Sequence, residues 1–377
     1  MTDHRARLDD TGRRGAAGNT DPDHSSSVRI VADPGPPTTA VQRVHDRLDE
    51  RLRSEAGIDS LSVATETLSL DPEGGLLVLD AVRHSETGSS VLAVITEFPR
   101  MDHRRGLIAE VDHGRSTIIV SLPALGLVTH RLIPALVAAV TRLGNPDAPS
   151  MVRGTSWYPG PQSDVEYLAS GKLLSRTRMV AGMVRGNRPW RLIPTLTGLM
   201  AAAAATASFG VFYSSIWAMA NALSPWRLAG LSVLSMVVMT VWLITNNRLW
   251  ERRGALPQAR ARLYNAATAT TVLLNAAVLY AGLFAATLCT SLAVIESGFL
   301  AQQLGVSSAS FLNYVYLAWL ATSMGTVAGA VGSSADSYED ILTATFGYRE
   351  RTRRRAEDDT DQRVDASRGA TTTEEES

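Results

Sequence analysis

Four long apolar stretches follow one another in the second half of the chain, and they constrain its fold more than any other feature. They cover residues 192–220, 228–245, 266–295 and 310–332. Between residues 192 and 334, the ionisable side chains other than Cys and Tyr are Arg227, Glu296 and six that lie between Arg248 and Arg262. Crossing a hydrocarbon core of about 30 Å takes roughly 20 helical residues. The pattern therefore predicts four transmembrane helices and disfavours the alternative, a succession of buried helices in a soluble protein.

The positions of the arginines predict the direction in which these helices cross the membrane. Clusters of basic residues precede the first stretch, separate the second from the third, and follow the fourth. The other two connections, about Asn221–Trp226 and Glu296–Ala309, are short and have only Arg227 beside them. Because basic loops are retained on the cytoplasmic side, we expect a multi-pass protein of the cell membrane with both termini in the cytoplasm. The N-terminus lacks the apolar region of a cleavable signal, so the internal stretches are expected to direct insertion.

The first half of the chain predicts a folded cytoplasmic domain over residues 38–145. A helix with apolar residues at helical spacing opens it and ends near Gly57, and a second helix at about 130–143 closes it. Between them lie runs with strand character, at residues 60–70, 76–83, 91–98, 106–111 and 116–122. We therefore expect an α+β domain, whose sheet is a mainly antiparallel meander with both helices on one face, ahead of a four-helix membrane bundle.

The remaining segments are expected to link or flank these two units. Residues 1–37 mix Asp, Arg, Gly, Ser and Pro without periodicity, which predicts disorder. Residues 146–190 are expected to form a linker and then a basic amphipathic helix that lies near the anionic inner surface of the membrane. After the last apolar stretch we expect a short cytoplasmic helix at residues 335–350 and a disordered tail at residues 351–377.

Small residues at four-residue spacing predict close helix packing in the membrane. Gly325 and Gly329 form a GxxxG pattern in the fourth stretch, and the first stretch carries a similar series that begins at Gly198. Such faces let helix backbones approach closely where lipid offers no hydrophobic drive for association. Packing within the bundle is favoured, and a homodimer through Gly325 and Gly329 is the alternative.

The apolar stretches contain few groups that could carry a substrate or an ion. Asn275 is the one strongly polar residue that lies deep, and Glu296 falls at the outer boundary, where a carboxylate stays hydrated. Transport pathways usually place ionisable groups at the middle of the membrane. We therefore interpret Asn275 as an interhelical hydrogen-bonding residue rather than as a substrate ligand.

Histidines beside acids are the only suggestion of a metal site. They occur as Asp102-His103 and Asp112-His113, and His130 follows further along the chain. A strand of six residues would separate the two pairs by about 20 Å. Because a metal needs three or four converging ligands, we interpret these residues as solvated turn residues.

Other motifs that carry chemistry are missing from the sequence. It contains no P-loop, GxGxxG, GxSxG, HExxH or CxxC pattern. The segment SLPALG at residues 121–126 could present backbone amides to an anion, although a plain turn is the simpler interpretation. The sequence therefore predicts no catalytic, cofactor-binding or metal-ligating residues and no cofactor, and it favours a role other than catalysis.

Several segments resemble a known family. They include GNRPWRLIPTLTG at residues 186–198, NNRLWERR, LNYVYLAWLATSMGTVAGAVGS and FGYRERTRRR, and the resemblance extends from about Val91 onward, SLPALG included. The chain is similar in these segments to a family of uncharacterised actinobacterial four-span membrane proteins. The resemblance implies the membrane topology and a bacterial source, and it implies no activity and no functional residues.

Taken together, these features favour a membrane-anchored cytoplasmic interaction or regulatory module. The α+β domain would bind a protein, a lipid headgroup or a small ligand, and the bundle would anchor it. The alternative is a transporter or a membrane subunit of a transport complex; an embedded enzyme ranks third because no set of acid, base and nucleophile is visible. The expected partners are the lipid bilayer and an unidentified protein, and no nucleic acid is expected.

Overall fold

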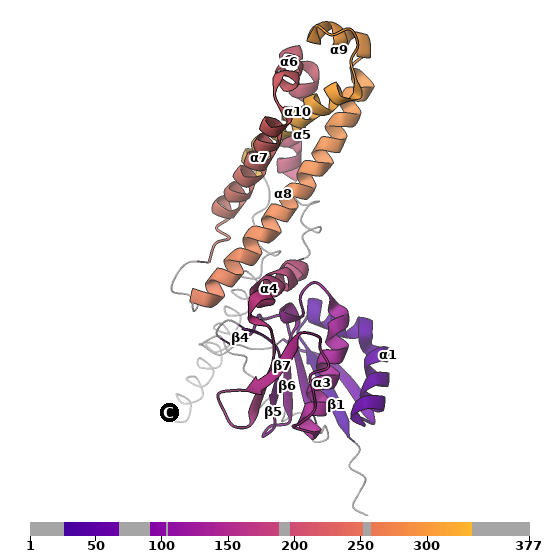
Figure 1. The fold of residues 1–377 in the computed structure, drawn as a ribbon, viewed down its shortest axis with the longest axis vertical. Coiled ribbons are helices and arrows are strands. Elements are labelled where there is room, and N and C mark those ends of the chain that lie inside the picture. The colour runs from indigo at the N-terminus through magenta and orange to yellow at the C-terminus, as the bar shows by residue number, and fades with distance from the viewer. Residues whose placement is uncertain (1–25, 68–90, 103–104, 188–196, 252–257, 334–377) are drawn as a thin grey trace, which may run out of the picture.

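The structure is a computed structural model that describes residues 26–67, 91–102, 105–187, 197–251 and 258–333. An N-terminal region of strands and helices forms one end of the molecule, and a bundle of helices extends from it along the long axis (Figure 1). The predicted strand at 76–83, the predicted helix at 335–350 and the predicted tail at 351–377 lie outside the described residues.

One mixed sheet forms the centre of the N-terminal region. Its strand order is β2-β1-β3-β6-β5-β8-β7, and the short β4 pairs with β5. Strands β2, β1, β3 and β6 run parallel to one another, whereas the pairs β6–β5, β5–β8 and β8–β7 are antiparallel. The strands are β1 Ser27–Ala32, β2 Ser60–Thr65, β3 Val91–Thr96, β4 Met101–Asp102, β5 Arg105–Asp112, β6 Thr117–Ser121, β7 Thr155–Pro159 and β8 Val165–Ser170.

The α+β character of this region is confirmed, and the predicted mainly antiparallel meander is wrong. The parallel half arises because β1 is followed by helix α1, Pro36–Ala56, and then by β2, which lies beside β1 in the same direction. Parallel neighbours need such a crossover, usually through a helix. The sequence predicts α1 but not β1, because residues 27–32 fall within the segment predicted to be disordered. Without β1, the parallel crossover could not be predicted.

Folded structure extends beyond residues 38–145 at both ends. Strand β1 lies within the segment predicted to be disordered, and β7 and β8 lie within the segment predicted to be linker and helix. Five of the six residues of β1 are buried, as expected for a central strand that is covered on both faces. Its short apolar run was obscured by the polar residues that surround it on the sequence.

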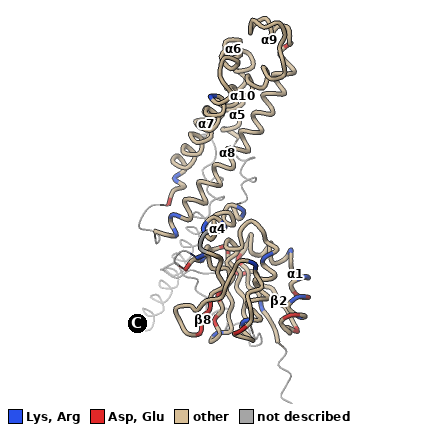
Figure 2. Tube along the Cα trace, viewed as in Figure 1, with Lys and Arg blue, Asp and Glu red and all other residues tan. Residues whose placement is uncertain are grey.

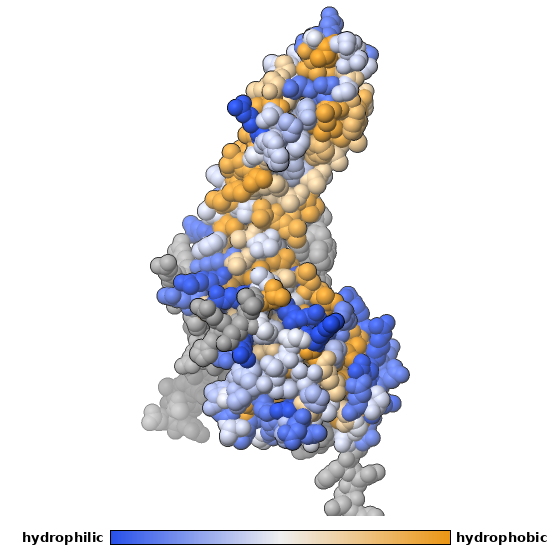
Figure 3. Space-filling model, viewed as in Figure 1, coloured by the Kyte–Doolittle hydropathy of each residue, from blue (hydrophilic) through white to orange (hydrophobic). Residues whose placement is uncertain are grey.

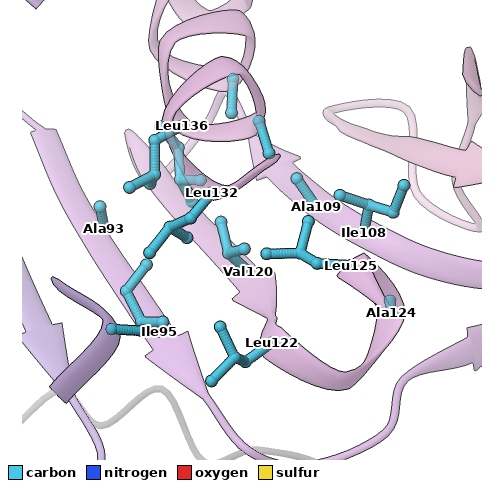
Figure 4. Packing of buried hydrophobic residues seen from close by; sticks show 14 of the residues in the cluster. Ala93, Ile95, Ile108, Ala109, Val120, Leu122, Ala124, Leu125, Leu132 and Leu136 are labelled. Atoms are coloured by element: carbon cyan, nitrogen blue, oxygen red, sulfur yellow. The ribbon is translucent and has the colours of Figure 1, made fainter. Parts of the chain in front are cut away.

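Helices α1 and α3, Leu132–Gly144, contact each other and share one hydrophobic core with the sheet. Two short 3-10 helices, η1 (Leu122–Leu125) and η2 (Thr129–Arg131), connect β6 to α3. Figure 4 shows Leu132 of α3 close to Val120 of β6, with Leu122 and Leu125 of η1 nearby. Gly57 ends α1 in the left-handed conformation, at φ 64°, as the sequence predicts for a helix stop.

Among the described residues, three helices of the bundle are long and apolar enough to cross a membrane: α7, α8 and α10. A fourth crossing exists if α5 and α6, which meet at an angle of 87°, count as one span. The first predicted stretch is therefore broken near Tyr213 rather than one continuous helix. The bounds are α5 Thr197–Phe212, α6 Ser214–Ala222, α7 Pro225–Asn246, α8 Gln258–Val294, α9 Ser297–Leu304 and α10 Phe311–Gly332.

The small residues of α10 pack against α5 of the same chain. A Cβ atom placed on Gly325 would lie 2.6 Å from the carbonyl oxygen of Ala203, and one on Gly329 would lie 2.9 Å from Ala203 Cβ. Glycine is thus needed where these two helix backbones meet. A homodimer through Gly325 and Gly329 would require α5 to leave this face.

Helix α4, Lys172–Asn187, joins the two parts of the molecule. Met179 and Met183 of α4 are fully buried in the same hydrophobic core as Tyr264 and Ala267 of α8. The 37 residues of α8 measure about 55 Å, which exceeds the roughly 30 Å of a hydrocarbon core. The excess length lets the first turns of α8 contact the domain (Figure 1). The helix predicted to lie near the inner membrane surface therefore uses much of its apolar face for protein contacts.

Candidate functional site

A pocket of about 690 Å³ opens in the N-terminal region beside α4. Its walls are the segment 125–128 after β6, the turn 153–154 before β7, the end of β8 and the exposed side of α4, together with Arg131 of η2. Pockets that hold small ligands usually measure roughly 300–1,000 Å³. We call it the arginine pocket because its charged lining residues are Arg131, Arg153 and Arg178.

The three guanidinium groups of this pocket have no acidic partner among the described residues. Within the described part of the chain, no carboxylate lines the pocket, and no side chain forms an ion pair or hydrogen bond with these arginines. Elsewhere in the same domain arginines do pair, as in the contact of 2.7 Å between Arg100 Nη2 and Glu110 Oε2. The arginine pocket is therefore a concentration of uncompensated positive charge in a concave surface.

Close backbone contact between η1 and α4 shapes one wall of the pocket. Gly182 of α4 lies so near η1 that an added Cβ would stand 2.7 Å from the carbonyl carbon of Pro123. Gly126 ends η1 at φ 81° and ψ −147°, a conformation that only glycine adopts easily. A Cβ on Gly126 would lie 2.8 Å from Cγ of Arg178. The stem of Arg178 is thus laid against Gly126, which holds this arginine at the pocket.

Hydrogen bonds fix the first turns of α4 to the sheet. The amide of Gly106 in β5 donates to Ser175 Oγ, and Ser170 Oγ at the end of β8 donates to the same atom at 3.2 Å. All three residues join strands β5 and β8 to α4. The N-terminal end of α4, which carries a partial positive charge from the helix dipole, is therefore held at the pocket.

Large apolar side chains form part of the pocket wall and yet face solvent. Leu174 of α4 is 74% exposed, and Leu127 and Val128, which follow η1, are 66% and 39% exposed. Single exposed apolar residues are common on protein surfaces, whereas clustered ones mark interaction sites. The arginine pocket thus combines cationic and apolar groups at one opening.

The sequence pointed to part of this site and missed the rest. The segment SLPALG forms the end of β6, η1 and Gly126, and its last two residues line the pocket. The amide of Gly126 donates to the carbonyl oxygen of Pro123, so this amide is already used. The arginines come from three separate segments of the chain, which is why no spacing motif could reveal them.

The edge of the sheet where parallel strands end is a second place where ligands often bind. At the carboxyl ends of β1 and β3 the strand order diverges, because β1 is followed by β2 on one side and β3 pairs with β6 on the other. Asp33 lies at this point and is fully buried. Its Oδ2 accepts hydrogen bonds from Thr96 Oγ1 at 2.9 Å and from the amide of Glu97 at 3.3 Å. Thr38 Oγ1 donates to the Asp33 carbonyl oxygen at 2.7 Å. Asp33 therefore ties β1 to β3 and to the start of α1, which is a structural role.

The residues considered for a metal site lie in different places. Asp102 is in β4, the Asp112-His113 pair is at the turn after β5, and His130 is exposed in η2, while His103 lies outside the described residues. Over the described ranges, no group of three or more His, Cys, Asp or Glu side chains is placed to hold a metal ion. His113 Nε2 lies 3.2 Å from Glu166 Oε2, so its partner is an acid on β8 that the sequence did not suggest.

Glu166 is the centre of a charged cluster that joins three elements. Arg142 of α3 donates from Nε to Glu166 Oε2 at 2.7 Å and from Nη2 to Oε1 at 2.8 Å. Hydrogen bonding from Arg142, together with the contact to His113, lowers the pKa of Glu166 below its ordinary value near 4.5. Both side chains are mostly buried, and the paired geometry stabilises the ionised carboxylate.

We expect the Glu166→Gln substitution to lower the free energy of unfolding of the domain by about 2 kcal/mol at pH 7. A carboxylate with a lowered pKa contributes stability that is present above the unfolded-state pKa and is lost as pH falls through the folded-state pKa. The wild-type melting temperature should therefore fall below about pH 4.5, and that part of the fall should be smaller in the variant. Thermal melting of the purified protein between pH 3.5 and 7 measures both effects. Glu50→Gln, on the exposed side of α1, should behave as wild type; equal losses in the two variants would contradict this role.

Polar groups inside the bundle form a second cluster. Tyr280 Oη of α8 lies 2.8 Å from Ser232 Oγ of α7 and 2.9 Å from Ser323 Oγ of α10. Such bonds between helices stabilise a membrane bundle modestly. Asn275 is buried, but its Oδ1 has no hydrogen-bond partner in the part of the chain that the structure describes, and neither has Thr322 Oγ1 of α10. The interhelical hydrogen bond predicted for Asn275 is therefore not formed by its side-chain oxygen.

No protein-family model matches the chain, and neither a curated protein nor a solved structure matches it. The fold and the site define a class: a chain with three to four helices apolar enough to cross a membrane, joined through α4 to an α+β domain with a cationic pocket.

Proposed function

We propose that the protein is a membrane-anchored cytoplasmic interaction or regulatory module. The observation that carries this proposal is the continuity between the two parts of the molecule. Leu263, Tyr264 and Ala267 of α8 belong to the hydrophobic core of the domain, and Asn187 Nδ2 of α4 donates to Thr271 Oγ1 of α8 at 3.0 Å. A domain held in this way moves with the bundle, so a ligand bound beside α4 acts on an element that also contacts α8.

The proposed orientation has four spans and places both termini and the domain in the cytoplasm of a cell-membrane protein. Basic residues gather at the end of the bundle that meets the domain, and few charges lie at the opposite end (Figure 2). Arg227 is in the first turn of α7, and Glu296 caps the start of α9. The positive-inside rule then assigns the domain end to the cytoplasm. On the face that Figure 3 shows, apolar residues are more abundant on the bundle and hydrophilic residues are more abundant on the domain.

One observation favours the alternative, a transporter or a membrane subunit of a transport complex. The buried oxygen atoms of Asn275 and Thr322 without partners are groups that a passing substrate or water could satisfy. Neither residue lines the arginine pocket or the smaller pocket at the base of α7 and α8, beside Trp250 and Arg262. The observations therefore support the interaction module more strongly.

Cysteine labelling tests the orientation on which the module depends. In a Cys289→Ser background, single cysteines would be introduced by Ser156→Cys in β7 and Ser307→Cys between α9 and α10, both at exposed positions. A membrane-impermeant maleimide should label the second variant in intact cells and the first only after lysis. Labelling of the β7 cysteine in intact cells would overturn the proposed function.

Crosslinking tests whether the domain engages a ligand or partner. A photoreactive residue in place of Leu127, which lines the arginine pocket, should crosslink to a cellular molecule in native membranes. The same residue in place of Glu50, which is exposed on α1 and distant in sequence from the pocket, should give no such adduct. Equal adducts from both positions, or adducts from neither, would count against a specific module.

A further inference from the structure

We propose that the arginine pocket binds the phosphate group of an anionic phospholipid headgroup in the membrane leaflet that faces the domain. This inference rests on the proposed function, because it requires the domain to be held at the membrane. It names the class of ligand that the site accepts.

The charge of the pocket selects an anion. Arg131, Arg153 and Arg178 line it, and within the described part of the chain no carboxylate lines it beside them. Arginine presents several donors in a planar fork that matches the oxygens of a phosphate. Like charges gathered without a partner repel one another, so a bound anion would relieve a cost that the free protein carries.

The protein positions one of the three arginines, Arg178, before any ligand arrives. Arg178 rests against Gly126, and the turn of α4 that carries it is fixed by the contact between Gly182 and Pro123. The lining also includes Gly171, next to the first turn of α4, where the helix dipole favours an anion. Binding therefore needs little ordering of the backbone, and the entropic cost of association is reduced.

The apolar wall distinguishes a lipid from a soluble phosphate compound. Leu127, Val128 and Leu174 line the same opening as the arginines and remain exposed to solvent. A free phosphate or a sugar phosphate offers nothing that these side chains could contact. A phospholipid offers both an anionic headgroup for the arginines and acyl chains beside it, as peripheral membrane sites require.

The position of the pocket brings it within reach of the bilayer. Helix α4 contributes Arg178 and Ala181 to the pocket, while Met179 and Met183 pack into the core that includes α8. Figure 1 shows α4 lying across the end of the domain that meets the bundle. A helix with its side chains is about 10–12 Å wide, so the pocket lies roughly one helix diameter from the first turns of α8, where the bundle leaves the membrane and meets the domain.

The test compares lipids on the full-length protein purified in a mild neutral detergent. Short-chain phosphatidylglycerol, phosphatidylcholine, glycerol 1-phosphate and inorganic phosphate would be titrated while the melting temperature is recorded. We expect phosphatidylglycerol to raise the melting temperature and the other three compounds to leave it unchanged. The triple variant Arg131→Gln/Arg153→Gln/Arg178→Gln should bind phosphatidylglycerol at least about tenfold more weakly than wild type.

A matched triple variant controls for total charge. Arg47→Gln/Arg53→Gln/Arg115→Gln removes the same number of positive charges from α1 and from the turn after β5, away from the pocket. It should bind phosphatidylglycerol as wild type does. Arg153→Gln alone, at an exposed position, should fold normally and still weaken binding, which keeps the test valid if the pocket triple variant does not fold.

Each other outcome overturns the inference. Equal weakening in the two triple variants would show a general attraction between the domain and anionic lipid. Stabilisation by inorganic phosphate or glycerol 1-phosphate without phosphatidylglycerol would show a soluble phosphate ligand instead. With either of these two results this inference fails. The proposed function would still stand if cysteine labelling places the domain in the cytoplasm.

Discussion

Gly325→Val is expected to destabilise the bundle strongly, by about 3 kcal/mol, because the added atoms have no room beside α5. A Cβ on Gly325 would lie 2.6 Å from the backbone oxygen of Ala203 and 3.1 Å from Ala207 Cβ. A backbone oxygen cannot turn aside as the end of a flexible side chain can, so α5 itself would have to move. The melting temperature of the detergent-purified protein should fall by roughly 6–12 °C.

Gly230 supplies the matched control for this substitution. It lies in α7, and no atom approaches within 4 Å of the position that its Cβ would take. Gly230→Val should therefore change stability by no more than about 0.5 kcal/mol. Size-exclusion chromatography adds a second readout: if Gly325 served a homodimer instead, the valine variant would become monomeric while the melting temperature of the monomer stayed unchanged.

Hydropathy predicted well the helices that are long and apolar enough to cross a membrane, since this property depends on length and composition alone. It could not predict the bend between α5 and α6, because the stretch stays apolar through Tyr213. The side chain of Trp217 stabilises the bend through two hydrogen bonds across it and a ring contact with a residue distant in sequence. Trp217 Nε1 donates to the carbonyl oxygens of Gly210 and Val211, which the end of α5 leaves without helical partners, and its ring packs against Phe299 of α9.

The N-terminal domain was predicted less completely, and strands β1 and β8 show why. β1 is a short apolar run next to polar residues, and only its pairing with both β2 and β3 makes it a strand. Val165 and Leu168 in β8 stand at a spacing that is also typical of a helix, so the sequence predicts them as part of the helix that follows. Non-local pairing decided both cases, and local periodicity carries no information about it.

The arginine pocket illustrates the same limit at a functional site. Arg131, Arg153 and Arg178 lie in η2, in a turn and in α4, and only the fold brings them together. On the sequence, Arg178 has a topological explanation because it belongs to the basic cluster before the first apolar stretch, and Arg131 and Arg153 belong to no motif. What separates these three from the others is concavity and the lack of an acidic partner among the described residues, and both are properties of the folded chain.

Gly182→Ala is expected to have the largest effect among single substitutions in the domain. The added methyl group would lie 2.7 Å from the carbonyl carbon and 2.8 Å from the Cα atom of Pro123, and both atoms belong to backbone. Helix α4 would have to lift away from η1 to admit it. We expect a loss of about 3 kcal/mol in stability, seen as a lower melting temperature.

Gly144→Ala is the matched control, and it should act in the opposite direction. Gly144 is the last residue of α3, with no atom within 4 Å of the position of an added Cβ. Alanine restricts the unfolded chain more than glycine does, so this variant should be unchanged or more stable by up to about 1 kcal/mol. A Gly182→Ala protein as stable as the Gly144→Ala protein would show that α4 does not depend on its contact with η1.

Gly182→Ala also tests whether the arginine pocket depends on the contact between α4 and η1. One wall of the pocket is formed by Leu125 of η1 and by Gly126, which follows η1, and another by Arg178 and Ala181 of α4. Lifting α4 from η1 should therefore open the pocket as well as weaken the domain. Limited proteolysis should then cut α4 faster in Gly182→Ala than in wild type, and phosphatidylglycerol should no longer raise its melting temperature. If the variant were cut faster yet still responded to the lipid, the pocket would not depend on the docking of α4, and the domain and the bundle would not be coupled through the ligand site.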